Sequence, residues 1–282
     1  MTRICFLNPF GTDQFDELVR ETLLPSLRAG TEVEIRHLED CPRNIDYYVP
    51  KHLVEVEVLR AVREAERDRF DAFVIGCCYD PALAQARELT DMPVVAPLEA
   101  AVLLARLFGH RFAVVTDHRK AVPELEDRVR VYGIEPNCRS VRAIDWYVDD
   151  MIHDPDAVAR NAHARCLEVM EADRAEAVVL GCTIIAACYE RAVLNGAHEL
   201  AAAAIINPNL MAVKVAELFA DLRAAGQYRI SRRGYYRRHA QHDPEEAQEV
   251  LETFLRARET AAPGGGGAGL RTAGAGGGEG RA

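Results

Sequence analysis

The sequence lacks the features that mark membrane, secreted and nucleic-acid-binding proteins. It contains no apolar run of the roughly 18 residues that a transmembrane helix needs. Its N-terminus, MTRICFLNPF, reaches a polar Asn-Pro turn before the apolar core of a signal peptide could form. The formal net charge of −10 argues against a general nucleic-acid binder. We therefore expect a cytoplasmic protein with no membrane or nucleic-acid partner.

Motifs for metals and cofactors are absent as well. The eight cysteines include no Cys-x-x-Cys pair, and the adjacent Cys77 and Cys78 are too close together for ordinary chelation. The nine histidines are scattered, and no lysine stands in a recognisable Schiff-base context. The sequence therefore predicts no metal and no cofactor, and its cysteines are expected to stay reduced.

Apolar β-branched runs alternate with helical patterns along most of the chain. Regular alternation of this kind predicts an α/β fold, with parallel sheets that carry helices on both faces. In such sheets ligands bind at the carboxyl ends of the strands. The predicted strands are residues 3–7, 31–37, 72–75, 93–96, 111–116 and 177–180, and the predicted helices are residues 13–27, 52–67, 81–89, 97–108, 122–132 and 156–171.

The chain contains an internal duplication. PVVAPLEAAVLLARLF (93–108) and AIINPNLMAVKVAELF (204–219) align without a gap, each as a short apolar strand, a proline and a helix. The strands 72–75 and 177–180 both end in Gly-Cys. Two units of this size indicate paired, pseudo-symmetric α/β sandwich halves rather than a solenoid. The predicted division is 1–110 with 205–225, 111–204, a C-terminal helical extension at 226–262 and a disordered tail at 263–282.

The C-terminal part departs from the duplicated pattern. Residues 263–282 are mostly glycine, alanine and polar residues, which cannot bury enough apolar area to offset the entropy of ordering. The basic, aromatic stretch 228–238 is predicted to be a solvated face. Residues 243–258 predict an amphipathic helix capped by Asp243. This extension packs on the core or mediates assembly, and we expect a homo-oligomer.

The equivalent Gly-Cys elements place Cys77 and Cys182 on opposite walls of one predicted cleft. A thiol between a strand and a helix lies near unpaired backbone N–H groups, which favour an anion. This setting predicts a thiol pKa lowered from about 8.5 into the range 3.5–7.5. One thiol could then remove a proton from a stereocentre while the other protonates the opposite face. The other cysteines, including Cys78, are predicted to be structural.

These motifs resemble those of the aspartate, glutamate and hydantoin racemase superfamily. VIGCCYDPALAQARE (74–88) is similar to its first cysteine motif and VVLGCTIIA (178–186) to its second, and the Asp-Pro after the first cysteine resembles the hydantoin (allantoin) branch. FLNPFGT (6–12) and residues 93–116 resemble further segments of that branch. The resemblance covers residues 1 to 222. It implies that Cys77 and Cys182 are the catalytic acid and base, without metal or pyridoxal phosphate.

Departures from the family pattern indicate the substrate. Phe10 stands in the N-terminal loop where the branch has Asn, and Ile184 stands where glutamate racemases have His. Losing that polar helper argues against a free amino acid, whose α-proton is only weakly acidic. A hydantoin, or an equivalent ureide, acidifies the same proton through its own carbonyl and nitrogen. The prediction is therefore a cofactor-independent racemase or epimerase of such a small molecule, or of an amino-acid derivative.

The same residues are also compatible with other functions. Relatives in the superfamily decarboxylate malonates or isomerise maleate, so a cysteine-dependent isomerase or decarboxylase of a small dicarboxylate is the alternative. A binding protein without turnover and a Cys77-Cys78 redox pair are further alternatives. The residues predicted to contact substrate are Asn8, Phe10, Tyr79, Thr116 and Thr183; all except Phe10 follow or end predicted strands, where turn chemistry alone also favours Asn and Thr.

Overall fold

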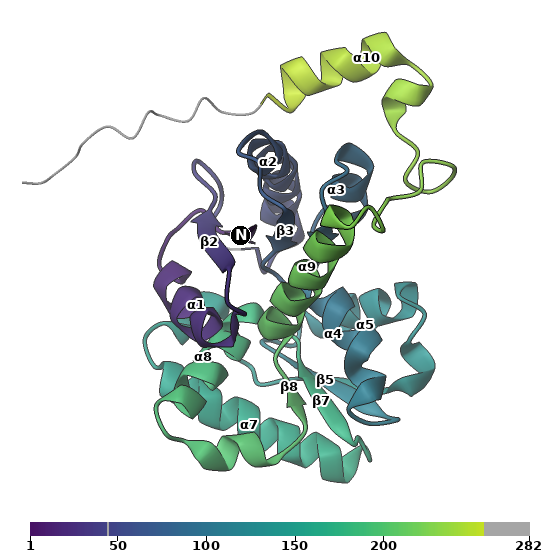
Figure 1. The fold of residues 1–282 in the computed structure, drawn as a ribbon. Coiled ribbons are helices and arrows are strands. Elements are labelled where there is room, and N and C mark those ends of the chain that lie inside the picture. Colours follow the sequence, from purple (N-terminus) through teal and green to yellow (C-terminus); the bar gives the residue numbers. More distant parts are fainter. Residues whose placement is uncertain (44, 257–282) are drawn as a thin grey trace, which may run out of the picture.

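The computed structural model describes residues 1–43 and 45–256. Its strands form two parallel four-stranded sheets, with the equivalent orders β2-β1-β3-β4 and β6-β5-β7-β8. This confirms the predicted α/β class with two parallel-sheet halves, which lie one above the other in Figure 1. The strands are β1 (Thr2–Asn8), β2 (Thr31–His37), β3 (Ala72–Ile75), β4 (Val94–Val95), β5 (Phe112–Thr116), β6 (Cys138–Ala143), β7 (Ala177–Leu180) and β8 (Ile205–Ile206).

Helices make the crossover connections that parallel strands require. Within the described residues, no helix combines the length and the hydropathy needed to cross a bilayer. The α-helices are α1 (Asp16–Leu23), α2 (Tyr48–Arg67), α3 (Leu83–Leu89), α4 (Pro97–Leu104), α5 (Val122–Val131), α6 (Val148–Met151), α7 (Pro155–Ala172), α8 (Thr183–Leu194), α9 (Pro208–Ala224) and α10 (Pro244–Glu249), and the 3-10 turns are Leu24–Ser26, Ala105–Leu107, Glu135–Asn137, His198–Ala202 and His239–Gln241.

Strand β6 is the strand that the sequence pattern does not predict. It pairs with β5 alone at the edge of the second sheet. It carries two exposed arginines, Arg139 and Arg142, and one buried residue, Val141, without a regular alternation. A single buried aliphatic side chain gives little apolar signal, so this strand depends on the hydrogen bonds that β5 offers at its open edge.

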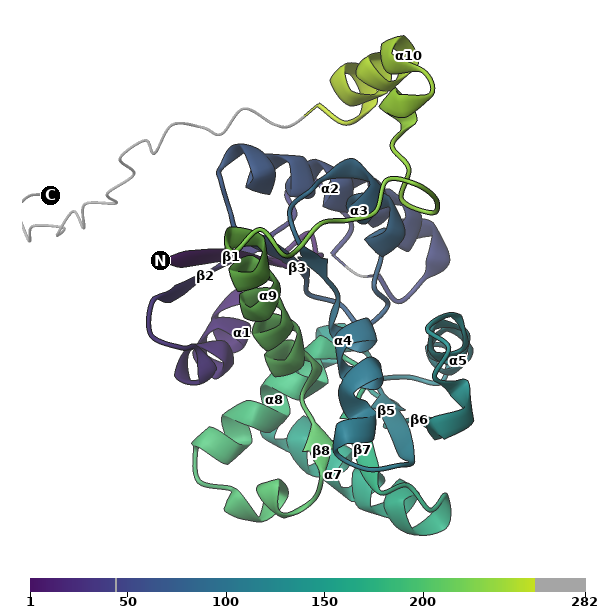
Figure 2. The ribbon, with the colours of Figure 1, turned by 45° about the vertical axis from the view of Figure 1, so that its right-hand side comes forward.

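The second of the two strand-proline-helix segments, residues 204–219, connects the two halves. Strand β8 pairs with β7, so Ile205–Ile206 belong to the second sheet, whereas the predicted boundary assigns residue 205 to the first half. Helix α9 begins two residues later and packs against β1, β3 and β4 of the first sheet. Figure 2 shows it in front of β1 and β3. The chain therefore crosses between the halves at Asn207 and Pro208, where proline fixes the first turn of the helix.

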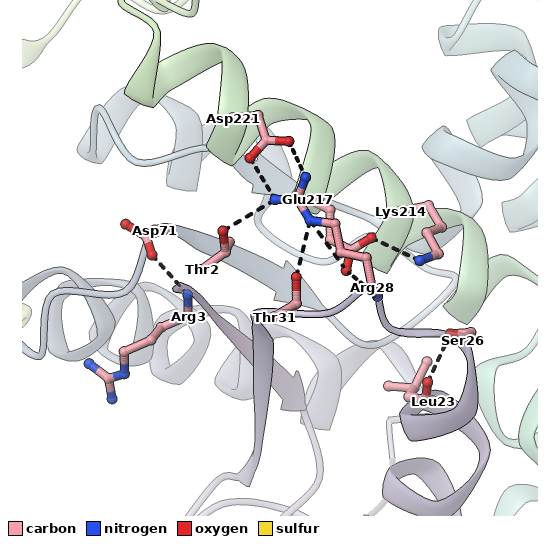
Figure 3. Close-up of polar contacts among 10 residues, drawn as sticks. All are labelled: Thr2, Arg3, Leu23, Ser26, Arg28, Thr31, Asp71, Lys214, Glu217 and Asp221. Carbon is pink, nitrogen blue, oxygen red and sulfur yellow. Dashed lines mark hydrogen bonds and ion pairs between the residues drawn. The ribbon is translucent and has the colours of Figure 1, made fainter.

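Polar contacts hold α9 to the edge of the first sheet (Figure 3). The guanidinium of Arg28, in the turn before β2, pairs with Asp221 of α9. The backbone N–H of Arg28 donates to Glu217 at 3.2 Å, and Lys214 pairs with the same carboxylate at 2.9 Å. Glu217 is 4% exposed, so its partners compensate for the cost of burying its charge.

The described part of the C-terminal extension, residues 226–256, packs on the first half. Arg232 donates hydrogen bonds to three backbone carbonyl groups at the end of α3, those of Arg87, Glu88 and Thr90, at 2.8, 3.1 and 2.6 Å. The predicted cap is confirmed, because the Asp243 carboxylate accepts from the backbone N–H of Glu246 at 2.9 Å. The end of the predicted helix 243–258 and the predicted tail 263–282 lie outside the described residues.

Candidate active site

A small pocket lies where the ends of the two sheets meet, and both Cys77 and Cys182 line it. Cys77 follows β3 of the first sheet, and Cys182 follows β7 of the second. The two thiols therefore reach one cavity from equivalent places in the two halves. The pocket holds about one water molecule. Its lining residues are Phe10, Ile45, Asp46, Cys77, Cys78, Tyr79, Asp117, Val148, Gly181, Cys182 and Thr183.

The glycine before each cysteine is required by close packing. The N–H of Gly76 donates to the carbonyl of Leu7 at 2.7 Å, and the N–H of Gly181 donates to that of Val115 at 2.7 Å. A Cβ at Gly76 would lie 2.6 Å from the Leu7 oxygen, and a Cβ at Gly181 would lie 2.6 Å from Val114 Cγ1. Only glycine lets the chain leave each strand so close to the central strand of its sheet.

The residue after each cysteine reaches across to the other half. Thr183 Oγ1 donates to the carbonyl of Gly76 at 3.1 Å. Cys78 Sγ donates to the carbonyl of Leu180 at 3.8 Å. Thr183 and Cys78 occupy equivalent positions in the duplicated chain, so this pair of contacts fixes the two cysteine loops against each other. The direction of the Cys78 thiol agrees with the structural role predicted for it, although Cys78 also lines the pocket.

The pKa values of the two thiols differ from the sequence-based prediction. Burial raises the pKa of Cys77 and the pKa of Cys182 well above the ordinary value of a thiol. Backbone N–H groups do act in the predicted direction: that of Tyr79 lowers the pKa of Cys77, and those of Ile184 and Ile185 lower that of Cys182. The prediction of a lowered pKa is wrong because desolvation of a thiolate outweighs these few dipoles.

The two walls carry different charges although their backbones are equivalent. The largest charge effect on Cys77 is that of Lys51, which opposes the rise in its pKa, although Asp80 and Glu124 add to that rise; the largest charge effect on Cys182 is that of Asp117, which adds to the rise. Lys51 Nζ lies 3.5 Å from the centroid of the Tyr79 ring and pairs with Glu124. The pocket is therefore more favourable to a thiolate on the Cys77 side than on the Cys182 side.

An acidic cluster that sequence reasoning missed lies beside the thiols. Asp46 and Asp117 line the pocket, and His118 Nε2 lies 3.4 Å from Asp46 Oδ1. Burial raises the pKa of Asp117 to about 6. Burial alone would lower the pKa of His118, but the carboxylates of Asp46 and Asp117 outweigh it and raise that pKa. Tyr147 stacks on the His118 ring, with 5.0 Å between ring centroids.

The same three side chains are the group within the described residues that could hold a metal ion. One ligand atom each from Asp46, Asp117 and His118 lies within 4.8 Å of the others. Two carboxylates and one imidazole are a donor set that divalent transition metals accept. A metal ion bound at these three side chains would contradict the sequence-based expectation of no metal.

The structure places the five predicted contact residues differently. Phe10, Tyr79 and Thr183 line the pocket, whereas Asn8 and Thr116, both described, do not. Asn8 Nδ2 donates to Asp16 at 2.6 Å, outside the pocket. The single hydroxyl proton of Thr116 is shared between two acceptors, the Gly181 carbonyl at 3.1 Å and Asp117 Oδ1 at 3.0 Å, so Thr116 supports the pocket wall from behind.

Three pocket residues that were not predicted, Ile45, Asp46 and Asp117, differ in how far the sequence indicates them. Asp117 directly follows β5, and the rule that ligands meet the carboxyl ends of parallel strands would have identified it. Ile45 and Asp46 come from the connection between β2 and α2, which has no periodic pattern. Their position depends on how this connection folds over the pocket.

Asp80, in the Asp-Pro pair after the first cysteine, is a buried cap. Its carboxylate accepts from the backbone N–H groups of Leu98 and Glu99 at the start of α4, at 3.2 and 2.9 Å. The hydroxyl of Tyr132, the residue directly after α5, donates to the same group at 2.5 Å. Burial raises the pKa of Asp80 to about 7. Asp80 therefore ties the first cysteine loop to the helix that leads into the second half.

We expect Asp80→Ala to lower the free energy of unfolding by about 2–4 kcal/mol, since it removes a cap and leaves a buried hydroxyl unpaired. The loss should be larger at pH 5 than at pH 8, because the contribution of a carboxyl with a raised pKa is full below its ordinary value of 3.8 and falls as pH rises to the folded value of about 7. Urea titrations at pH 5 and pH 8 measure it. Tyr132→Phe, the control, should cost about 1 kcal/mol; an unchanged Asp80→Ala midpoint would contradict the capping role.

Comparison with known proteins places the chain in a family. The family model described as Asp/Glu/Hydantoin racemase matches residues 4–216. A hydantoin racemase of Rhizobium meliloti is 34% identical over 215 residues, which are 76% of this chain and 87% of that protein. A hydantoin racemase of Pseudomonas sp. (strain NS671) is 32% identical over 180 residues, which are 64% of this chain and 72% of that protein.

A solved structure agrees with these sequence relatives. The allantoin racemase from Klebsiella pneumoniae superposes with a TM-score of 0.75 at 26% identity, and the match covers 84% of this chain and 94% of that one. The chain therefore belongs to the Asp/Glu/hydantoin racemase family, on the branch of the hydantoin and allantoin racemases, and its enzyme class is that of a racemase.

Proposed function

We propose that this racemase inverts a hydantoin- or ureide-like compound by passing protons between Cys77 and Cys182, without a cofactor. One observation carries the proposal: both thiols line a single small pocket and approach it from different halves of the chain. The relatives named as hydantoin and allantoin racemases support the substrate class. The pocket holds about one water molecule, so its walls must move apart when a substrate binds.

Two thiols are sufficient for inversion. The thiolate of one cysteine takes the proton from the stereocentre and becomes a thiol, and the electron pair moves onto the neighbouring carbonyl of the substrate. The thiol of the other cysteine then gives its proton to the opposite face and becomes the thiolate. The roles are exchanged after each turnover, so the enzyme runs in both directions.

The raised thiol pKa values suit this chemistry. A thiolate that burial makes unfavourable is a stronger base toward carbon, and the weakly acidic carbon of the substrate needs such a base. Hydrogen bonds from Tyr79 N–H to Cys77, and from Ile184 and Ile185 N–H to Cys182, stabilise each thiolate when it forms. The substrate's own carbonyl and nitrogen supply the remaining acidity.

The proposal is tested with single enantiomers of several 5-substituted hydantoins and of allantoin, incubated without added cofactor. We expect the optical rotation of either enantiomer to decay to zero. Cys77→Ser combined with Cys182→Ser is the matched control and should leave the rotation at the uncatalysed rate. If the wild type also leaves every enantiomer unchanged while it binds the compounds, the alternative of a binding protein without turnover would replace the proposal.

We expect activity to survive exhaustive chelation and the protein to show no pyridoxal absorbance. The reason is that the proposed proton transfers use only the two thiols. Activity is measured before and after dialysis against EDTA, and metal content is measured on the same samples. A loss of activity that zinc restores would contradict the proposal and would indicate a metal at Asp46, Asp117 and His118.

A further inference from the structure

The charged side chains that line the pocket are all acidic. The lining residues within the described chain include no lysine, arginine or histidine, and their charged side chains are Asp46 and Asp117. Two basic side chains lie behind the wall, and each faces a carboxylate: Lys51 pairs with Glu124, and His118 lies 3.4 Å from Asp46. A substrate carboxylate bound here would lose its hydration and would meet the Asp117 carboxylate, with no lysine, arginine or histidine among the lining residues to compensate it.

The Asp117 side chain is fixed by contacts to one of its two carboxylate oxygens. The residue is 2% exposed. Its Oδ1 accepts from the backbone N–H of His118 at 2.8 Å and lies 3.0 Å from the Thr116 hydroxyl, whose single proton it shares with the Gly181 carbonyl. Both of these contacts are made by the same oxygen, and the side chain lines the pocket beside Cys182, whose pKa its charge raises. Oδ2 is therefore the oxygen that can accept a hydrogen bond from a ligand.

From this arrangement we propose that Asp117 accepts a hydrogen bond from an N–H group of the substrate, and that the pocket thereby selects neutral N–H compounds against carboxylates. The inference rests on the proposed function and adds the basis of its specificity. An N–H beside the stereocentre is present in a hydantoin or a related ureide, which carries no charge there. A malonate or a maleate presents two carboxylates and no N–H, and a free amino acid presents a carboxylate beside its ammonium group. The same contact would set the stereocentre beside Cys182.

Binding of ligands that cannot react tests the inference separately from catalysis. 5,5-Dimethylhydantoin has no hydrogen on the carbon to be inverted, so calorimetry reports recognition alone. Its N1-methyl and N3-methyl derivatives each remove one N–H. The ring-opened N-carbamoyl-2-aminoisobutyrate keeps N–H groups but adds a carboxylate. All titrations contain EDTA.

We expect the wild type to bind the N1-methyl derivative, which lacks the N–H beside the stereocentre, at least tenfold more weakly than the parent, because a buried acceptor left unpaired costs that much. The ring-opened carboxylate should also bind at least tenfold more weakly. In Asp117→Ala the parent should weaken and its advantage over that N-methyl derivative should fall below threefold. Asp117→Asn should bind the carboxylate more tightly than the wild type does.

Asp145→Asn is the matched control, since Asp145 is an exposed carboxylate that pairs with Arg119 outside the pocket. It should keep the wild-type order of affinities. Equal binding of the parent and both N-methyl derivatives by the wild type would overturn the inference, and this comparison needs no variant to fold. An N-methyl penalty that persists unchanged in Asp117→Ala, or binding that requires added metal, would overturn it as well.

The two proposals fail in different ways. If the affinities follow the expected order but no hydantoin or ureide is racemised, the recognition by Asp117 stands and the proposed reaction is wrong. If hydantoins are racemised but the affinities ignore Asp117 and the N–H groups, the reaction stands and the inference is wrong.

Discussion

Replacing either Cys77 or Cys182 by serine should reduce racemisation in both directions by at least about 10²–10⁴-fold, the usual effect of a general acid–base group. Inversion needs a proton carrier on both faces of the substrate, and a serine hydroxyl is far less acidic than a thiol. Exchange of the α-proton with deuterated solvent needs only the base on one face. Cys77→Ser should therefore keep measurable exchange with one enantiomer, and Cys182→Ser with the other.

Mass spectrometry or NMR of each enantiomer in deuterated buffer measures this split. Cys138→Ser is the control: this thiol lies outside the pocket in β6, donates to the carbonyl of Ser140 at 3.6 Å, and should change neither rate much. If both active-site variants lost exchange with the same enantiomer, or if Cys182→Ser racemised normally, the opposed-thiol mechanism would be wrong. Loss of cysteine dependence altogether would point to another base.

The second large effect is that of pH. We expect kcat/KM to rise about tenfold per pH unit between pH 7 and pH 9, because burial keeps both thiols protonated in this range and the active form needs one thiolate. The rate rises with pH because the thiol pKa values are raised. A raised thiol pKa leaves little thiolate at neutral pH, so each unit of pH multiplies the reactive fraction until the first thiol titrates.

Two variants should move this profile in opposite directions. Asp117→Asn removes a negative charge that raises the pKa of Cys182, so its profile should shift toward lower pH. Lys51→Met removes a positive charge that lowers the pKa of Cys77, so its profile should shift toward higher pH. Rates are corrected for uncatalysed racemisation at each pH. A profile that is flat from pH 7 to pH 9 would mean that a thiolate is already present and would contradict the expectation.

Much of the fold could be predicted because its elements carry local patterns. Strands β2, β3 and β7 begin and end where the alternating or continuous apolar runs predict. The gapless match of residues 93–108 to 204–219 predicts two copies of one unit, and β4–α4 and β8–α9 are those copies. Strand β6 could not be predicted because one buried valine among exposed arginines forms no apolar pattern. It is a strand because it pairs with β5.

The candidate site divides in the same way. Both cysteines could be predicted because each follows a buried strand and a glycine that close packing requires. The choice of Asn8 and Thr116 as substrate contacts relied on their places at strand ends. In the structure both side chains bond to neighbouring groups instead: the Asn8 amide donates to Asp16, and the Thr116 hydroxyl lies at hydrogen-bond distance from the Gly181 carbonyl. A hydrogen-bond partner supplied by a distant segment cannot be inferred from a strand end alone.

The sequence by itself determined the α/β halves, their duplication and the two Gly-Cys turns, because each depends on residues within one short segment. Only the tertiary structure decided what surrounds the thiols. It brought Asp46 from an irregular connection and Asp117 from the end of β5 to the same pocket, and it buried Cys77 and Cys182 deeply enough to raise their pKa values. Desolvation depends on every group that covers a side chain, and those groups come from all over the chain.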